Sequence, residues 1–250
     1  MAKKYRIDDL QINGLRLKQS RELFCFGVDA VLLANYAAKF IKKEHKVMDL
    51  GCGNGIIAVL LSAKCDAERI DGLELNEESV ALAQENIILN GLQNRLNIVW
   101  GDMRNDDCIP HPTKYDVVLS NPPYIKHSDG KVNEKTALAA AKHELTCTLA
   151  QVLACGQRLL KAGGSFVMIH RTQRLAEIVQ QMKQQGIEPK ELLLIYPKEG
   201  KKSNLFMIRG VKGAKEWIDV LPPLFIYDKE NQYTAEFNDF CHKNQPFARR

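Results

Sequence analysis

The chain has 250 residues, 45% of them hydrophobic and 26% charged, which suits one folded domain with a substantial core. No apolar run reaches the roughly 18 residues of a membrane span, and the first residues lack the apolar stretch of a signal peptide. We therefore expect a cytoplasmic protein without a transmembrane helix. The 7 cysteines are scattered and form no Cys-x-x-Cys pair, which is typical of reduced thiols and argues against a disulfide framework or a zinc site. A formal net charge of +5 is too small to identify a partner.

Strand-like and helix-like segments alternate along the chain. Strands are predicted near 46–50, 70–75, 96–100, 115–120, 165–169, 191–196 and 204–210. Helices are predicted near 28–40, 55–64, 77–90, 136–161 and 173–185, with Gly163-Gly164 ending the fourth. This alternation favours an α/β fold, a Rossmann-like and mostly parallel seven-stranded sheet with helices on both faces. We expect this domain over 46–212, a lead-in and lid over 1–45, and an extension over 213–250 without its own core.

The first candidate site lies where the predicted strand 46–50 ends. The stretch Asp49-Leu50-Gly51-Cys52-Gly53-Asn54-Gly55 alternates glycines, which allow a tight turn and close approach of a ligand to the backbone. The dinucleotide fingerprint differs, because its third glycine falls one residue later. Glu74 ends the next strand, where a carboxylate can accept both hydroxyls of a ribose. Together these residues indicate a nucleoside-containing cofactor.

The second candidate site is Asn121-Pro122-Pro123-Tyr124, which ends the apolar run 115–120. Two prolines remove two N–H donors and restrict the backbone, so this loop is stiff. The side chain of Asn121 and the carbonyl of Pro122 can accept the hydrogens of a planar –NH₂ group while Tyr124 stacks on its plane. Taken alone, the tetrapeptide also fits a proline-rich turn without function.

The motifs fall at the carboxyl ends of strands, so they converge on one crevice of an open parallel sheet. The motifs resemble, in their order along the chain, those of class I S-adenosylmethionine-dependent methyltransferases: 49–55, Glu74, Gly101-Asp102-Met103 and 121–124. The motif at 121–124 resembles that of the methyltransferases that act on planar –NH₂ groups. Phe24 and the stretch Gly27–Ala34 are similar to the lead-in of bacterial tRNA1(Val) adenine N6-methyltransferases, which modify the adenine beside the anticodon. The resemblance covers roughly residues 20 to 210.

The resemblance implies S-adenosylmethionine as the cofactor. Its implied binding residues are Asp49, Gly51, Cys52, Gly53, Asn54, Gly55, Glu74, Leu75, Asp102, Met103, Asn121, Phe24 and Asp29. Asp49 would steady the glycine loop or meet the methionine amine, and Glu74 would take the ribose. Asp102 would accept the adenine amino hydrogen with Met103 against the ring, the alternative being a solvated loop carboxylate. The Cys52 thiol is expected to pack.

Phe24 and Asp29 precede the first predicted strand, where a helix can cover the cofactor as a lid. The alternative is a hydrophobic staple and a helix cap, with Asp29 capping the helix from Ala30 onward.

Asn121, Pro122 and Tyr124 are the implied catalytic residues. The sulfonium methyl is already activated, so the reaction needs no metal and no covalent nucleophile. The adenine amino group is a poor nucleophile, because its lone pair is delocalised into the ring. Hydrogen bonds to Asn121 and to the Pro122 carbonyl would favour a pyramidal nitrogen and accommodate its growing positive charge.

Basic side chains are concentrated in 1–45 and 190–215, with Lys198, Lys201 and Lys202 in one loop. Candidate RNA contacts are these lysines, Pro123, and Arg171, which follows the fifth predicted strand. The alternative is that the lysine cluster is only a solvated face. An unpaired loop base can stack on aromatic side chains. With the resemblance, this favours RNA as the partner, specifically tRNA, for a monomeric protein without a metal or a membrane contact.

Three other functions stay open. Methyltransferases of release-factor glutamine amides also use Asn-Pro-Pro-Tyr, but usually carry a helical substrate domain before the glycine loop, where this chain has only 46 residues before Val47. DNA adenine methyltransferases commonly add a target-recognition domain, for which this chain has no room. The third is a cofactor-binding module that has lost catalysis and binds RNA. The presence of Asn121 and Tyr124 argues against this function.

Overall fold

The computed structural model describes residues 5–20, 27–105, 108–109, 114–122 and 147–242. Strands β1 (Tyr5–Asp9) and β2 (Arg16–Ser20) form an antiparallel hairpin. The main sheet contains β3 (Lys46–Leu50), β4 (Arg69–Glu74), β5 (Leu96–Trp100), β6 (Tyr115–Ser120), β7 (Leu160–Arg171), β8 (Ile187–Lys198), β9 (Leu205–Lys212), β10 (Asp219–Val220) and β11 (Leu224–Tyr227). The helices are α1 (Val28–Ala38), α2 (Ile56–Lys64), α3 (Glu77–Leu89), α5 (Leu149–Leu159), the 3₁₀ turn η2 (Thr172–Arg174), α6 (Leu175–Gln184) and α7 (Ala235–His242).

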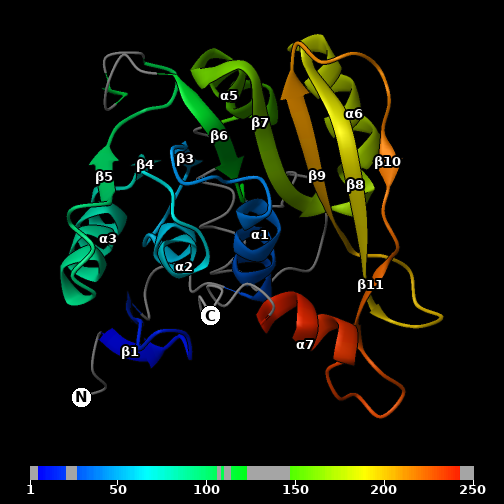
Figure 1. Ribbon diagram of the computed structural model, residues 1–250, viewed down its shortest axis with the longest axis horizontal. Helices are drawn as coiled ribbons and strands as arrows, with labels where there is room; N and C mark the ends of the chain where they lie inside the picture. The colour runs from blue at the N-terminus through cyan, green and yellow to red at the C-terminus, as the bar shows by residue number, and fades with distance from the viewer. Residues whose placement is uncertain (1–4, 21–26, 106–107, 110–113, 123–146, 243–250) are drawn as a thin grey trace.

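The main sheet is mostly parallel, as the alternating pattern predicts. Its strand order is β10-β8-β9-β7-β6-β3-β4-β5, with β11 also paired to β8 (Figure 1). Strand β9 runs antiparallel to β7 and β8, and the other pairs are parallel. The glycine loop therefore follows a central strand, β3, where the chain order reverses between β4 on one side and β6 on the other.

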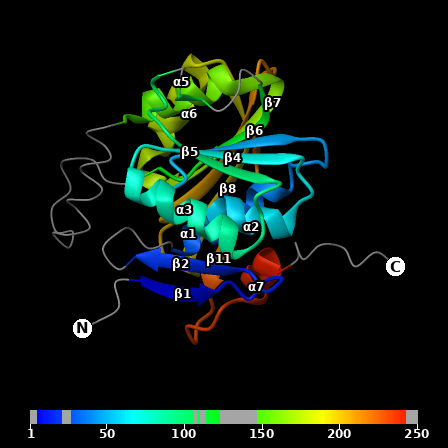
Figure 2. The same cartoon turned by 90° about the vertical axis from the view of Figure 1, so that its left-hand side faces the viewer.

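Helices cover both faces of the sheet, which confirms the predicted layering. Figure 2 shows α5 and α6 on one face and α1, α2 and α3 on the other, with the hairpin and α7 beyond the second layer. Side chains of a strand alternate between the faces. In β3, Val47 packs in the α1–α3 layer and Met48 in the α5–α6 layer. Two hydrophobic cores thus pack against opposite faces of the central strands.

Two details of the predicted architecture are wrong. Among the described residues the main sheet has nine strands, because residues 219–220 and 224–227 each add a short strand beside β8. The helix predicted near 136–161 begins at Leu149, where Thr148 and Gln151 form a capping box, and ends at Leu159. Gly163-Gly164 instead lies within β7, at an irregularity in its pairing with β6. Residues 136–146 lie outside the described part of the chain.

The C-terminal extension joins the core of the main domain. Leu224 and Ile226 of β11 and Phe237 of α7 are buried in the same hydrophobic cluster as α1 and β8. Residues 213–242 therefore contribute to the stability of the sheet rather than only lying along it. No helix among the described residues is long and apolar enough to cross a membrane.

Replacing Phe237 with Ala tests this contribution. Phe237 is 5% exposed, and removing a buried aromatic ring leaves a cavity as well as lost apolar burial. We expect Phe237→Ala to lower the free energy of unfolding by about 3 kcal/mol, measured by urea denaturation. Tyr233→Ala is the control, because Tyr233 stacks on Phe237 but is 52% exposed. A loss from Phe237→Ala below about 1 kcal/mol, or no larger than the loss from Tyr233→Ala, would contradict this contribution.

Candidate active site

Strand register brings the sequence motifs to one edge of the sheet. Leu50 at the end of β3 is paired with Leu73 of β4 and with Ser120 of β6. Glu74 is paired with Trp100 at the end of β5. The residues that follow these strand ends, including Gly51 and Asn121, therefore lie beside one another although they are far apart in sequence.

The glycine loop has a conformation that favours glycine at all three positions. Gly51, Gly53 and Gly55 have φ values of 73°, 55° and 80°. A Cβ atom at Gly51 or Gly53 would meet nothing within 4 Å, whereas one at Gly55 would lie 3.2 Å from Ala83 of α3. The first two glycines thus leave open space for a ligand, and the third allows the loop to pack on the helix.

Glu74 holds the glycine loop directly. Its carboxylate is 3% exposed and accepts the backbone N–H of Gly53 at 2.9 Å and that of Asn76 at 2.8 Å. Each carboxylate oxygen has a second lone pair, so Glu74 retains acceptor capacity for ligand hydroxyls. Sequence reasoning missed this loop-holding role, because the strand pattern does not predict which backbone N–H groups face the carboxylate.

Asp49 is a buried carboxylate without a hydrogen-bond partner in the described structure. It is 0% exposed, and neither oxygen accepts a hydrogen bond. Burial, reinforced by the negative charge of Glu74, raises the pKa of Asp49 to about 8. A buried acceptor pair at the end of β3 is costly unless a donor reaches it, so the site suits a cationic or hydrogen-bond-donating ligand group.

Asp102 follows β5 and forms a bidentate ion pair with Arg104. The Nε atom of Arg104 lies 2.9 Å from both carboxylate oxygens, and this hydrogen bonding lowers the pKa of Asp102. Met103 packs at the border of the α5–α6 core, and its carbonyl accepts from Arg158 at 2.9 Å. Asp102 is thus ionised and held in place, and its remaining lone pairs can accept a ligand amino hydrogen.

The end of β6 is fixed to β3 by a side chain. Ser120 is buried, and its hydroxyl donates to the Leu50 carbonyl at 2.9 Å. Asn121 and Pro122 follow at once and are half-buried. The hydrogen bond from Ser120 therefore fixes the position of the backbone from which the side chain of Asn121 extends. Pro123 and Tyr124 lie outside the described residues.

The other predicted cofactor contacts also lie around the loop. Cys52 is buried, burial raises the pKa of its thiol, and a Cβ atom on Gly72 would lie 2.8 Å from its sulfur. Asn54 is buried as well, and its carbonyl accepts from Asn86 at 3.1 Å. Leu75 is half-buried, and its carbonyl accepts from the indole of Trp100 at 2.9 Å.

Asp29 lies in the first turn of α1. Its carboxylate is buried and accepts the backbone N–H of Ala30 at 3.0 Å. Because α1 begins at Val28 with Gly27 as its N-cap, Asp29 is not the cap of a helix that starts at Ala30, and that alternative is wrong. Phe24 lies outside the described residues.

The candidate RNA contacts differ in their surroundings. Arg171 is exposed at the carboxyl end of β7, next to β6, whereas the neighbouring His170 is fully buried. Lys198 donates to the Lys229 carbonyl at 2.6 Å and to the Asn231 side chain at 3.1 Å. Lys201 and Lys202 are exposed in the loop between β8 and β9, at the same edge of the sheet. Strand β7 lies between β6, which Asn121 follows, and the β8–β9 pair that this loop connects.

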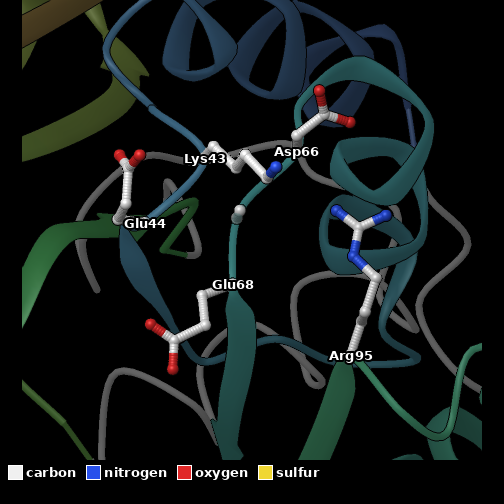
Figure 3. A pocket seen from close by; sticks show the side chains of 6 residues that line it. Lys43, Glu44, Asp66, Glu68 and Arg95 are labelled. Atoms are coloured by element: carbon white, nitrogen blue, oxygen red, sulfur yellow. The ribbon is translucent and has the colours of Figure 1, made fainter.

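A hollow of about 610 Å³ opens at the opposite edge of the sheet, where β3, β4 and β5 begin. Figure 3 shows Lys43, Glu44, Asp66, Glu68 and Arg95 around it. The guanidinium of Arg95 donates to the carbonyls of Ser62 and Cys65, at 3.1 and 2.8 Å, at the end of α2. None of the predicted site residues lines this hollow, so it is separate from the candidate active site.

The sheet order and the motif positions together define a class I S-adenosylmethionine-dependent methyltransferase. The family described as methyltransferase small domain matches residues 27–186, and the chain belongs to this family. A relative from Tolumonas auensis, named tRNA1(Val) (adenine(37)-N6)-methyltransferase, is 25% identical over 222 residues, 88% of this chain and 90% of the relative. A Proteus mirabilis protein of the same name is 33% identical over 144 residues, 57% of this chain and 55% of the relative.

Solved structures share the fold. A predicted O-methyltransferase from Agrobacterium tumefaciens superposes with a TM-score of 0.68 at 20% identity, covering 89% of this chain and 99% of its own. The tRNA m1G37 methyltransferase of M. jannaschii gives a TM-score of 0.60 at 13% identity, covering 86% of this chain and 59% of its own.

The buried Asp49 makes stability depend on pH in a defined direction. Because its pKa is raised from 3.8 to about 8 on folding, the folded state binds a proton that the unfolded state releases, so stability falls as pH rises through this range. We expect Asp49→Asn, which needs no proton, to be more stable than the wild type by a few kcal/mol above about pH 8 and to lose that advantage toward pH 4.

Urea denaturation of the cofactor-free proteins across this pH range measures the difference. Every other titrating group is common to both proteins, so the difference between the two profiles isolates Asp49. Parallel profiles would contradict the assignment.

Proposed function

We propose that this chain transfers a methyl group from S-adenosylmethionine to the exocyclic N6 amine of an adenine next to the anticodon of a tRNA. The observation that carries the proposal is the β3–β6 register, which sets Asn121 beside the glycine loop. The names of the curated relatives supply the substrate class. We further propose that the protein acts as a cytoplasmic monomer.

The residues of the crevice fit the cofactor. Asp49, a buried acceptor pair with no partner in the described structure, suits the methionine ammonium, and the open faces of Gly51 and Gly53 allow close approach. Glu74 retains lone pairs for the ribose hydroxyls, and Asp102 is held ionised to accept the adenine amino hydrogen. When bound, the cofactor supplies an activated methyl group on a sulfonium.

Asn121 and the Pro122 carbonyl act on the nucleophile. By accepting the two amino hydrogens they favour a pyramidal nitrogen and stabilise the positive charge that develops on it. Tyr124 is proposed to stack on the base. Fixing the amine relative to the methyl group supplies rate enhancement worth up to about 7–11 kcal/mol. The methylated ammonium is acidic enough to release its proton to water, so no strong base is required.

We assign RNA contacts outside the crevice to Arg171 and to the lysine loop. Arg171 is exposed next to the strand that carries Asn121, and Lys201 and Lys202 are exposed at the same edge of the sheet. Pro123 is proposed to border the base. Lys198 is a weaker candidate, because its ammonium is used to hold the turn at Lys229 and Asn231. In this scheme the lead-in over 1–45 covers the cofactor, with Phe24 and Asp29 in its lid.

Asn121→Ala is the test of this function. The variant loses the acceptor for the amine but keeps the carboxylates of Asp49, Glu74 and Asp102, so we expect a drop in kcat of roughly 100-fold or more with a nearly unchanged Kd for S-adenosylhomocysteine. Incubation with labelled S-adenosylmethionine and separate tRNA, rRNA, DNA and release-factor pools, followed by nucleoside mass spectrometry, gives the readout.

The outcomes separate the alternatives. Label in N6-methyladenosine of tRNA with the wild type, and its loss with Asn121→Ala, supports the proposal. Label in protein would select the glutamine alternative, and absence of label from every pool would favour a binding module. Normal methylation by Asn121→Ala would overturn the role of the carboxamide.

A further inference from the structure

Two asparagines of α3 bind the backbone of the N-terminal hairpin. Asn90 accepts the N–H of Arg16 at 2.9 Å and donates to its carbonyl at 2.7 Å. Asn86 accepts the N–H of Lys18 at 2.7 Å and donates to its carbonyl at 3.0 Å. Each carboxamide thus satisfies both backbone groups of one residue of β2, as a neighbouring strand would.

The spacing of the two elements makes this pairing possible. Four residues of a helix advance about 6 Å, and two residues of a strand advance about 6.6 Å. Asn86 and Asn90 are about one turn apart on α3. Arg16 and Lys18 are two residues apart in β2, so their backbone N–H and C=O groups lie on the same edge of the strand, the edge that faces the helix. The hairpin is therefore held in a single register on α3.

The two asparagines differ in what else they bind. The second amino hydrogen of Asn90 goes to the Asn86 carbonyl at 2.8 Å, within the same helix. The amino group of Asn86 instead also donates to the Asn54 carbonyl at 3.1 Å, inside the glycine loop. Asn86 is 0% exposed, so bulk water does not reach the Asn54 carbonyl at this contact. Asn86 is thus a direct hydrogen-bonded link between the hairpin and the loop.

We propose that Asn86 is a positioning residue for the methyl donor: it couples the N-terminal hairpin to the glycine loop and thereby sets the affinity for the cofactor. The inference rests on the proposed function only in that the loop binds S-adenosylmethionine. The hairpin lies before residues 27–186, which match the family, so a segment outside that match supports the cofactor site. Because coupling is reciprocal, the bound cofactor also stabilises the hairpin.

Asn86→Ala and its matched control Asn90→Ala test the coupling. Both variants remove one carboxamide from the hairpin contact, but only Asn86→Ala frees the carbonyl of Asn54. We expect Asn86→Ala to raise the KM for S-adenosylmethionine and the Kd for S-adenosylhomocysteine by roughly five- to tenfold with kcat near wild type. Asn90→Ala should change both constants by less than about twofold. Steady-state kinetics and isothermal titration calorimetry give these values.

Equal effects of the two variants on KM and Kd would overturn the proposal, because they would show only a general loss of packing. If the wild type itself failed to bind S-adenosylhomocysteine, the proposed function would fail instead, so the two failures are distinguishable.

Hydrogen exchange of the wild type provides a test that requires no variant to fold. S-adenosylhomocysteine should slow exchange of the Lys18 amide, which is bonded to Asn86, more than exchange of the Arg16 amide, which is bonded to Asn90. An unchanged Lys18 amide would also overturn the proposal.

Discussion

The hydrogen bond from the Gly53 N–H to the Glu74 carboxylate is the interaction on which the site depends. It joins the loop after β3 to the end of β4, and it fixes a backbone that only glycine adopts at low cost. With this bond in place, the faces of Gly51 and Gly53 stay open and Gly55 rests on α3. The same carboxylate that is available to the ligand therefore also shapes the surface that receives it.

The two buried acids near the loop differ in their hydrogen bonding. Glu74 is satisfied by two backbone N–H groups, whereas Asp49 has no partner in the described structure and its pKa is raised, partly by the charge of Glu74. Folding thus buries a carboxyl group, at the end of a central strand, whose ionised form is destabilised. Such a cost is expected where binding offsets it, since a cationic group stabilises the ionised form of Asp49 and relieves its repulsion with Glu74.

The elements at the two ends of the chain support the main sheet in different ways. The hairpin attaches through the side chains of α3, so its position is set by two carboxamides rather than by strand pairing. The C-terminal extension attaches through strand pairing with β8 and through the buried ring of Phe237. The first contact reaches the glycine loop, whereas the second joins the edge of the sheet at β8 and the helical layer that contains α1.

The sequence by itself determined the α/β class, the central strands and the motif residues, because strand periodicity, glycines and prolines are local signals. It did not reveal the hairpin, β10 or β11, which are short and are stabilised by contacts with distant residues. Three features were decided by the tertiary structure alone. Glu74 accepts from Gly53, Asp49 has no hydrogen-bond partner among the described residues, and the Asn86 amino group donates to both Lys18 and Asn54. These features depend on which backbone groups face a side chain after the strands and helices pack, and no local pattern encodes that.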